Sequence, residues 1–216
     1  MSSLKENFMF TGLVQSKGIM LRSEPLAQAS RWRIRSELAQ RIKGGDSVSV
    51  NGVCLTALEP TPSEFSVEIS PETLQRSSFS HLKPNQSLNL ELPATPQSFL
   101  GGHWVQGHVD GVGEILQVEK LGDFHSIVIQ LPKALMIWMP PKGSVCVDGV
   151  SLTVNETESE KNQISLMIIP QTWHSTIFSG YSIGTRVNIE ADSFVKSIHH
   201  FWTEHLRTQP NLGSRP

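Results

Sequence analysis

Cysteine is scarce in this chain, and long apolar runs are missing from it. Cys54 and Cys146 are too few for a disulfide framework or a zinc finger. Residues 1–8 lack the apolar stretch of a secretory signal peptide, and the apolar residues 134–139 are too few to span a membrane. We therefore expect a soluble protein of the reducing cytoplasm that has no membrane association.

An excess of positive charge is also absent. The 216 residues include 18 Lys and Arg against 20 Asp and Glu, which gives a formal charge of −2. Because a phosphate backbone is bound through a basic surface, nucleic acid is excluded as a partner. Glycine and proline are frequent, with 16 and 13 residues, and such a composition is typical of short elements joined by turns. The length allows one large domain or two small ones.

The sequence contains an internal repeat. Residues 47–56 read SVSVNGVCLT and residues 144–153 read SVCVDGVSLT, so seven of ten positions are identical at an offset of 97. The register continues on both sides, where residues 12–15 align with 107–110, 71–73 with 170–172, and 89–91 with 188–190. A solenoid needs three or more units of about 20–50 residues, so two units of this length indicate two duplicated domains.

Each repeat has the pattern of short strands. The dipeptides Asn51-Gly52 and Asp148-Gly149 are strong signals for tight turns. Residues 87–92 alternate between polar residues and leucine, the period of a strand with one buried face, and residues 187–190 do the same. We expect a small closed β-barrel in each half, and an all-β fold class.

Helical periodicity is clearest near the C-terminus. Asp192 or Ser193 can cap a helix, and apolar residues follow at helical spacing. The apolar positions are Phe194, Val195, Ile198, Phe201, Trp202 and Leu206. Such a stripe leaves an exposed apolar patch on a monomer, so we favour an oligomer contact over packing against the chain's own barrel. Residues 27–43 fit a strand followed by a short helix, but their apolar pattern alone does not decide between strand and helix.

Five motifs in order give the chain a resemblance to a known family. They are Met9–Gly12, Asn51–Thr56, Pro71–Leu74, the run Gly101–Gly111 with its two histidines, and Asp148–Thr153. Together they resemble riboflavin synthase of the alpha-chain type, a duplicated lumazine-binding barrel family. The resemblance implies two tandem homologous six-stranded Greek-key β-barrels, a C-terminal α-helix and a homotrimer. The implied domains are residues 1–104, with 1–8 as a flexible tail, then 105–192, and an oligomerisation helix and tail over 193–216.

The resemblance also implies a reaction. Two molecules of 6,7-dimethyl-8-ribityllumazine dismutate, and the transfer of four carbon atoms yields riboflavin and 5-amino-6-(D-ribitylamino)uracil without a cofactor. One lumazine binds to each barrel, and the active site forms where the N-terminal barrel of one subunit meets the C-terminal barrel of its neighbour. The lumazine 7-methyl group is acidic, so the site must stabilise an anion and hold two rings together. Positioning can supply about 7–11 kcal/mol of such a barrier, and directed donors supply more.

The site residues implied by the resemblance form one set for each repeat. The best candidates for a part in the chemistry are Cys54, His108, Ser47 and Asp192. We expect Phe10 to supply a stacking face, and Thr56 and Thr153 to bind the pteridine edge. The other substrate-binding candidates of the first half are Gly12, Leu13, Val14, Leu55, Glu68, Ile69, Ser70, Pro71, Glu72 and Thr73. Those of the second half are Gly107, Val109, Lys142, Ser151, Leu152, Met167, Ile168, Ile169, Pro170, Gln171 and Thr172.

Some of these residues also have a purely structural interpretation. A cysteine in a strand is usually a small buried hydrophobe, which we expect for Cys146, whereas Cys54 aligns with a polar residue. We expect His103 to be structural and no metal to be bound, because His103 and His108 would point to opposite faces of a strand. Lys142 is either a turn residue or a substrate contact.

The main alternative function is a non-catalytic antenna protein that binds lumazine or flavin on the same fold. A binder needs one good pocket in each chain, whereas the enzyme needs two pockets of unlike character. Both halves keep an Asn/Asp-Gly-Val-x-Leu-Thr signature, yet Cys54 aligns with Ser151 and His108 aligns with Leu13. These unlike pairs favour the enzyme, because function is decided by the site and not by the fold.

Overall fold

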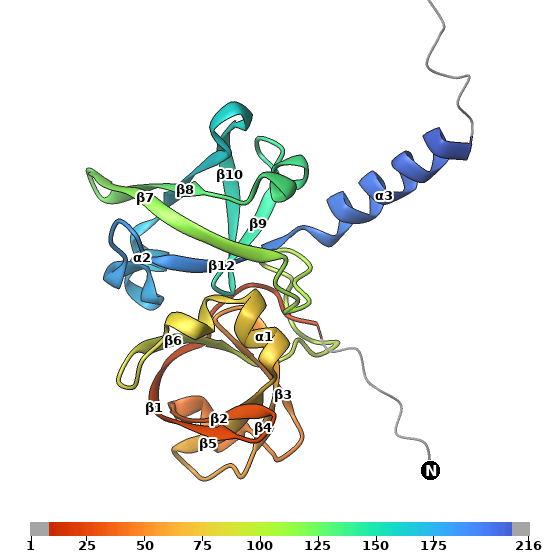
Figure 1. Ribbon diagram of the computed structural model, residues 1–216. Coiled ribbons are helices and arrows are strands. Elements are labelled where there is room, and N and C mark those ends of the chain that lie inside the picture. Colours follow the sequence, from red (N-terminus) through yellow and green to blue (C-terminus); the bar gives the residue numbers. More distant parts are fainter. Residues whose placement is uncertain (1–8, 209–216) are drawn as a thin grey trace, which may run out of the picture.

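Residues 9–208, which the computed structural model describes, form two closed antiparallel β-barrels followed by a helix (Figure 1). The all-β class and the two barrels confirm the fold expected from the repeat. The tail expected over residues 1–8, and the last part of the region 193–216, lie outside the described residues.

The first barrel closes in the order β1-β2-β5-β4-β3-β6, which is a Greek key. Its strands are β1 (Ser16–Leu26), β2 (Ala29–Arg35), β3 (Ser47–Val50), β4 (Val53–Leu58), β5 (Glu64–Ile69) and β6 (Ser87–Glu91). Its helical segments are η1 (Glu37–Arg41), α1 (Pro71–Arg76) and η2 (Ser78–His81). The stretch 27–43 is therefore a strand, β2, followed by a short 3₁₀ helix, η1.

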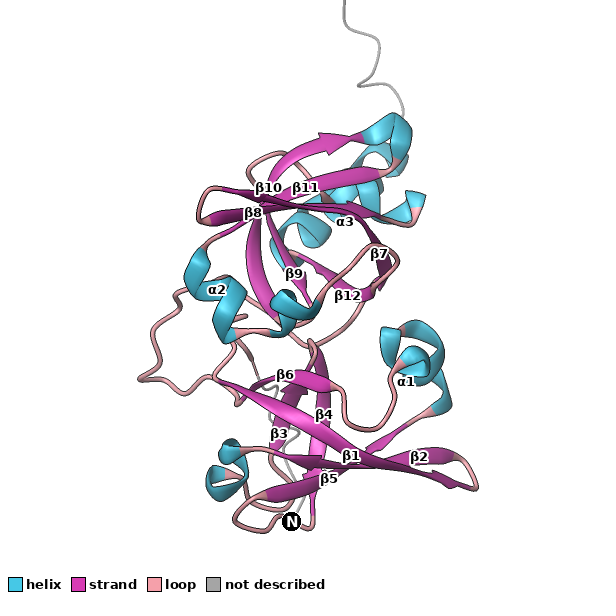
Figure 2. Ribbon diagram, turned by 90° about the vertical axis from the view of Figure 1, so that its left-hand side faces the viewer, coloured by secondary structure: helices cyan, strands magenta, loops and turns pink. Residues whose placement is uncertain are grey.

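The second barrel repeats this topology strand for strand. Its strands are β7 (Gly111–Leu121), β8 (Phe124–Gln130), β9 (Ser144–Val147), β10 (Val150–Glu158), β11 (Gln163–Ile168) and β12 (Arg186–Ala191). Its helical segments are η3 (Lys133–Trp138), η4 (Ser159–Lys161), α2 (Pro170–Ser175) and η5 (Ile177–Gly180). The equivalent helices α1 and α2 lie on opposite sides of the junction between the barrels (Figure 2).

The two predicted tight turns meet where the barrels join. Asn51 and Gly52 have φ angles of 44° and 76°, and Asp148 and Gly149 have 44° and 79°, so both pairs adopt the left-handed conformation that a type I′ turn requires. A Cβ atom on Gly52 would lie 2.7 Å from the backbone nitrogen of Gly149. Only glycine permits this approach, which places the two hairpins against each other across an approximate twofold axis.

The polar residues of β6 and β12 correct one sequence-based expectation. The alternating pattern predicted one buried and one solvated face, but Asn89 and Asn188 are each 1 % exposed. Asn89 Nδ2 donates to the Asp148 carbonyl oxygen at 2.9 Å, and Asn188 Nδ2 donates to the Asn51 carbonyl oxygen at 2.8 Å. The second face is therefore buried against the other barrel, where these amides satisfy the backbone of the hairpin turns.

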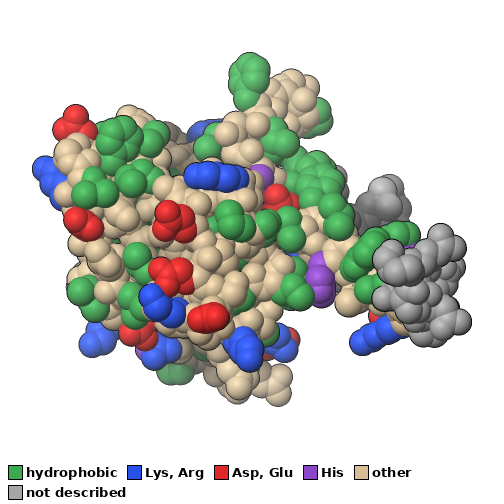
Figure 3. Space-filling view, turned by 90° about the horizontal axis from the view of Figure 1, so that it is seen from above, with side chains coloured by type: hydrophobic (Ala, Val, Ile, Leu, Met, Phe, Trp, Pro, Cys, Tyr) green, Lys and Arg blue, Asp and Glu red, His purple; other side chains and the backbone are tan. Residues whose placement is uncertain are grey.

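The helix α3 (Ser193–Thr208) projects away from the second barrel (Figure 1). Asp192 caps it, since its Oδ1 accepts a hydrogen bond from Phe194 N at 2.9 Å. Its stripe is open to solvent, with Ile198, Phe201 and Trp202 exposed to 69 %, 72 % and 60 %, and hydrophobic side chains are visible where the chain leaves the main body (Figure 3). This stripe does not pack against the chain's own barrel. Among residues 9–208, no helix is long and apolar enough to cross a membrane.

Candidate functional site

Two short segments run between the barrels, and we call them the first crossing segment (residues 10–14) and the second crossing segment (residues 105–109). They pair antiparallel at one point, where Phe10 N donates to the Val105 carbonyl oxygen at 2.8 Å and Val105 N donates to the Phe10 carbonyl oxygen at 3.1 Å. Each segment precedes one barrel in the sequence and lies against the other barrel in the structure.

Glycines hold the two crossing segments against their strands. The Gly12 carbonyl oxygen accepts a hydrogen bond from Ser151 N at 2.8 Å, and that of Gly107 accepts one from Cys54 N at 2.9 Å. Both glycines have positive φ, 74° and 76°, and a Cβ atom on either would lie 2.6 Å from the Cβ atom of its partner. No other residue fits there, because it would collide with the strand and strain the backbone.

Because each crossing segment lies against the other barrel, the grouping of the site residues into a first-half set and a second-half set has to be corrected. Gly12 was grouped with Cys54 as a residue of the first half but lies against Ser151, whereas Gly107 of the second half lies against Cys54. Val14 packs on the core of the second barrel and Val109 on that of the first. Each of the two sites therefore contains residues from both repeats, which a linear alignment does not reveal.

The first site is a pocket of about 280 Å³, which we call the Cys54 pocket. It brings together six residues expected at the site, namely Cys54, Glu72, Thr73, Gly107, His108 and Val109. Val53, Arg76 and Ser77 also line it and were not among the expected residues. Arg76 pairs with Glu72 at 3.1 Å, but both side chains are more than two-thirds exposed, so this ion pair contributes little stability.

The helix α1 gives this pocket one of its walls. The Ser70 hydroxyl accepts a hydrogen bond from Thr73 N at 3.1 Å, and Pro71 occupies the first turn, where its missing N–H costs nothing. The equivalent helix α2 has Ile169 at its N-cap and no side-chain cap. The two equivalent helices thus differ in polarity at their N-caps.

Burial raises the pKa of the Cys54 thiol, while a hydrogen bond with Ser47 acts in the opposite direction. The charge of Glu190 also raises this pKa. The group is therefore a neutral thiol near pH 7, able to donate a hydrogen bond or a proton but a weak nucleophile. His108 is exposed at the same pocket.

The second site centres on Ser151, and we call it the Ser151 site. Ser151 Oγ lies 2.7 Å from His103 Nδ1, within hydrogen-bonding distance. His103 is only 8 % exposed, and its Nε2 has no hydrogen-bond partner. Burial lowers the pKa of His103, and the charge of Asp192 acts against this shift. The imidazole is thus held neutral beside a hydroxyl and near a carboxylate.

His103 was expected to be structural and was not among the site candidates. Its placement depends on Gly102, where a Cβ atom would lie 2.0 Å from the Thr11 carbonyl oxygen. The glycine pair before the histidine is the signal that could have marked this close approach. The expectation that His103 and His108 share a strand was wrong, since both lie on irregular backbone and face different sites.

Phe10 does not have the exposed face expected for stacking. Its side chain is 0 % exposed and packs with Val105 and Cys146 in a small cluster between the barrels. The apolar ring is buried because the crossing segments meet there. Cys146, 1 % exposed in the same cluster, is the buried hydrophobe expected from the sequence.

The other expected residues have varied positions. Buried in the barrels are Ser47, Leu55, Ile69 and Ile168, and partly buried are Leu152, Pro170 and Thr172. Exposed are Leu13, Thr56, Glu68, Ser70, Pro71, Thr153, Ile169 and Gln171. Lys142 is an exposed turn residue with φ 65°, and its backbone N donates to the Val154 carbonyl oxygen at 2.7 Å. Met167 lines a separate pocket of about 270 Å³ on the second barrel.

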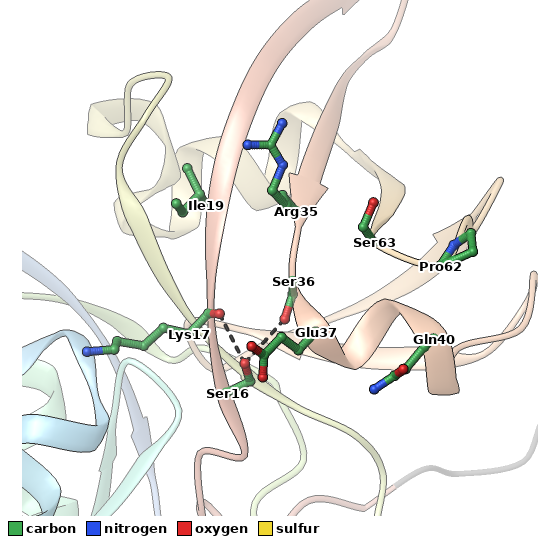
Figure 4. A pocket seen from close by; sticks show the side chains of 9 residues that line it. All are labelled: Ser16, Lys17, Ile19, Arg35, Ser36, Glu37, Gln40, Pro62 and Ser63. Atoms are coloured by element: carbon green, nitrogen blue, oxygen red, sulfur yellow. Dashed lines mark hydrogen bonds between the residues drawn. The ribbon is translucent and has the colours of Figure 1, made fainter.

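Another pocket, of about 600 Å³, lies beside β1, β2 and η1 (Figure 4). Ser36 Oγ donates to Ser16 Oγ at 3.4 Å, and Ser16 Oγ donates to the Lys17 carbonyl oxygen at 3.1 Å. None of the residues expected at the site lines this pocket. Over the described range 9–208, no group of three or more His, Cys, Asp or Glu side chains is arranged to hold a metal ion.

Comparisons with known proteins agree with the duplicated architecture. Residues 11–93 and 106–192 match the family model of the lumazine binding domain. Riboflavin synthase of Mycobacterium bovis is 39% identical over 193 residues, which cover 88% of this chain and 96% of that protein. Riboflavin synthase of Bacillus subtilis is 36% identical over 194 residues, which cover 89% of each.

Solved structures share the fold. LumP complexed with 6,7-dimethyl-8-(1′-D-ribityl)lumazine superposes with a TM-score of 0.76 at 22% identity, covering 85% of this chain and 99% of that chain. LumP complexed with riboflavin gives a TM-score of 0.77 at 23% identity over the same shares. At this level of identity the likeness shows the fold alone.

Proposed function

The chain belongs to the riboflavin synthase family, and we propose that it catalyses the dismutation of two 6,7-dimethyl-8-ribityllumazine molecules. One molecule donates a four-carbon unit to the other, and the products are riboflavin and 5-amino-6-(D-ribitylamino)uracil. All atoms of the two substrates are found in the two products, so no external oxidant or reductant is required.

One observation carries this proposal: the chain has two sites with the same backbone frame and different polar side chains. The Cys54 pocket contains a neutral thiol and His108, and the Ser151 site contains a hydroxyl bonded to His103. Two identical substrate molecules must take different parts in a dismutation. Sites that hold the ring alike but surround it with different donors provide that difference.

The chemistry requires a proton to leave the acidic 7-methyl group of one lumazine and the resulting anion to be stabilised. The pteridine itself delocalises the charge, so the protein has to supply oriented donors and close contact between the rings. We assign the proton transfer to His108, which lines the Cys54 pocket. We assign hydrogen-bond donation to the developing negative charge to the Cys54 thiol and the Ser151 hydroxyl.

We also propose that the chain is a homotrimer in the cytoplasm, with each complete active site formed by the first barrel of one subunit and the second barrel of its neighbour. The exposed apolar stripe of α3 supports the assembly, because such a surface is stabilised by burial against another chain. The two free cysteines, Cys54 and Cys146, suit a reducing compartment.

Incubation of the protein with 6,7-dimethyl-8-ribityllumazine tests the proposed function directly. Riboflavin absorbance and one equivalent of the pyrimidine product for each riboflavin are expected. A chromophore that is bound and recovered unchanged would instead identify a non-catalytic lumazine-binding protein on the same fold.

A further inference from the structure

Two buried glutamates that do not line the Cys54 pocket hold the crossing segments in place. Glu91, at the end of β6, and Glu190, in β12, are each 2 % exposed. Burying a carboxylate costs free energy unless hydrogen bonds replace those to water. The groups that each carboxylate binds therefore indicate its structural role.

The carboxylate of Glu190 binds the backbone of the second crossing segment. Its Oε1 accepts a hydrogen bond from Gln106 N at 2.7 Å, and its Oε2 accepts from Gly107 N at 2.9 Å and from His108 N at 3.0 Å. These three donors are consecutive, so the carboxylate fixes the course of the segment where it passes Cys54. The backbone of His108 is held directly.

Glu91 makes the equivalent contacts at the first crossing segment. Its Oε1 accepts from Thr11 N and from Thr11 Oγ1, both at 2.7 Å, and its Oε2 accepts from Gly12 N at 3.1 Å. Leu13 N donates to Thr11 Oγ1 at 3.3 Å. Glu91 therefore binds the first segment both directly and through the Thr11 hydroxyl, whereas Glu190 binds three successive backbone N–H groups of the second.

Each carboxylate thus supports a site composed of residues from both barrels. Glu190 belongs to the second barrel and positions the segment that lines the Cys54 pocket on the first. Glu91 belongs to the first barrel and positions the segment that lies against Ser151 on the second.

We propose that Glu190 and Glu91 are positioning residues that each control one ligand site, Glu190 the Cys54 pocket and Glu91 the Ser151 site. The identity of the ligand rests on the proposed function, whereas the positioning of the two segments does not depend on it. A glutamine at either position keeps the shape and replaces one accepting oxygen with an amide that cannot accept. At least one backbone N–H then loses its partner in a buried place, and the segment moves.

The reactivity of Cys54 towards an aromatic disulfide reagent measures the geometry without any turnover. Cys146 is buried, so the fast-reacting thiol is Cys54. Glu190→Gln is expected to increase the labelling rate of Cys54 at least fivefold, because the second crossing segment covers it. Glu91→Gln is the matched control, with the same chemical change at the other site, and is expected to leave the rate within twofold of the unmodified chain.

Equilibrium titration with riboflavin, followed by quenching of its fluorescence, measures the two sites separately. Each variant is expected to lose at least tenfold in affinity at one site and to keep the other within twofold. Steady-state turnover is expected to fall in both, with kcat lowered more than KM is raised in Glu190→Gln because His108 is displaced. A residue that only stabilises the fold would weaken both sites together or neither.

A second pair of variants covers the case in which the glutamine variants do not fold. Gly107→Ala and Gly12→Ala push the same two segments from their strands without changing a carboxylate, and should reproduce the two labelling patterns. Equal labelling of Cys54 in Glu190→Gln and Glu91→Gln, or in both alanine variants, would overturn the inference. If the unmodified chain makes no riboflavin, the proposed function fails, while the labelling contrast still tests the positioning.

Discussion

The Cys54 pocket and the Ser151 site have one backbone frame and two sets of side chains. In both, a glycine with positive φ accepts a hydrogen bond from a strand residue, and a buried glutamate fixes the segment that carries the glycine. The side chains differ at two equivalent positions. Cys54 and His108 of the Cys54 pocket align with Ser151 and Leu13 of the Ser151 site, whereas Thr73 aligns with Thr172. The duplication thus kept the backbone frame of the two sites, whereas the side chains at these two positions diverged.

A second contrast lies at the junction itself. The first hairpin carries neutral Asn51, and the second carries Asp148, which is bonded to the hydroxyl of Tyr181. Burial raises the pKa of Asp148 to about 7. Only the second barrel continues into α3. The two halves are therefore unlike in charge and in assembly surface as well as in their sites.

Removal of α3 is expected to have the largest effect on this comparison. A chain that ends after Asp192 loses the apolar stripe, and each large side chain buried in an interface contributes about 1.5–3 kcal/mol. If complete active sites need unlike sites from two subunits, riboflavin formation should fall at least a hundredfold while both sites still bind lumazine. Size-exclusion chromatography and turnover are the measurements. A monomeric truncated chain with undiminished turnover would show that one chain contains the whole active site.

Exchanging the unlike residues should have the next largest effect. Cys54→Ser makes the two sites alike at this position, and turnover is expected to fall about tenfold. This is less than the roughly 10²–10³-fold cost of losing a transition-state donor, because the serine hydroxyl still donates. Lumazine affinity should change little, because shape and backbone contacts remain. Ser151→Cys is the matched control, because it makes the two sites alike with a thiol in each. The double variant that combines Cys54→Ser with Ser151→Cys has unlike sites again, with the thiol and the hydroxyl exchanged between them. Full activity in Cys54→Ser would mean that this asymmetry has no part in the reaction.

The pattern of the sequence was sufficient for the fold. Asn51-Gly52 and Asp148-Gly149 form the tight turns they predict, because type I′ turns depend on local backbone freedom. Periodicity could not show that the second face of β6 is buried. A strand whose polar face packs on another barrel has the same alternation as one whose polar face meets water, and only long-range contacts of residues such as Asn89 distinguish them.

The resemblance named six of the nine residues that line the Cys54 pocket, but not their arrangement. Cys54 and His108 were assigned to different halves but share a pocket, and Gly12 of the first half lies at the Ser151 site. Exchange of segments between barrels leaves no trace in a linear alignment, because each segment still precedes its own barrel. The burial of Phe10 was missed for the same reason.

A smaller effect is expected on the dependence of stability on pH. The pKa of an aspartate in the unfolded chain is near 3.8, whereas burial raises the pKa of Asp148 in the fold to about 7. The fold therefore binds this proton more tightly. Its contribution to stability is fully present below about pH 4 and is lost as pH rises towards 7, with a slope of up to about 1.4 kcal/mol per pH unit.

Asp148→Asn makes the second junction resemble the first and should flatten this slope, as measured by urea unfolding between pH 4 and 8. Part of the slope should persist, because burial also raises the pKa of Glu190 to about 7. Asn51→Asp is the reciprocal control and should steepen the slope. Identical pH profiles for the unmodified chain and Asp148→Asn would show that folding does not raise the pKa of Asp148.

The smallest effect, none at all, is expected from a strong chelator. Metal sites in proteins usually need three or more ligands within about 2.0–2.6 Å of one point. The two histidines that a metal site would need are divided between the sites, His103 bonded to Ser151 and His108 at the Cys54 pocket. Dialysis against chelator should therefore leave both lumazine affinity and turnover unchanged. Activity that is lost on dialysis and recovered with zinc or magnesium would show that an ion joins the two sites, and the contrast between them would then have to be explained through that ion.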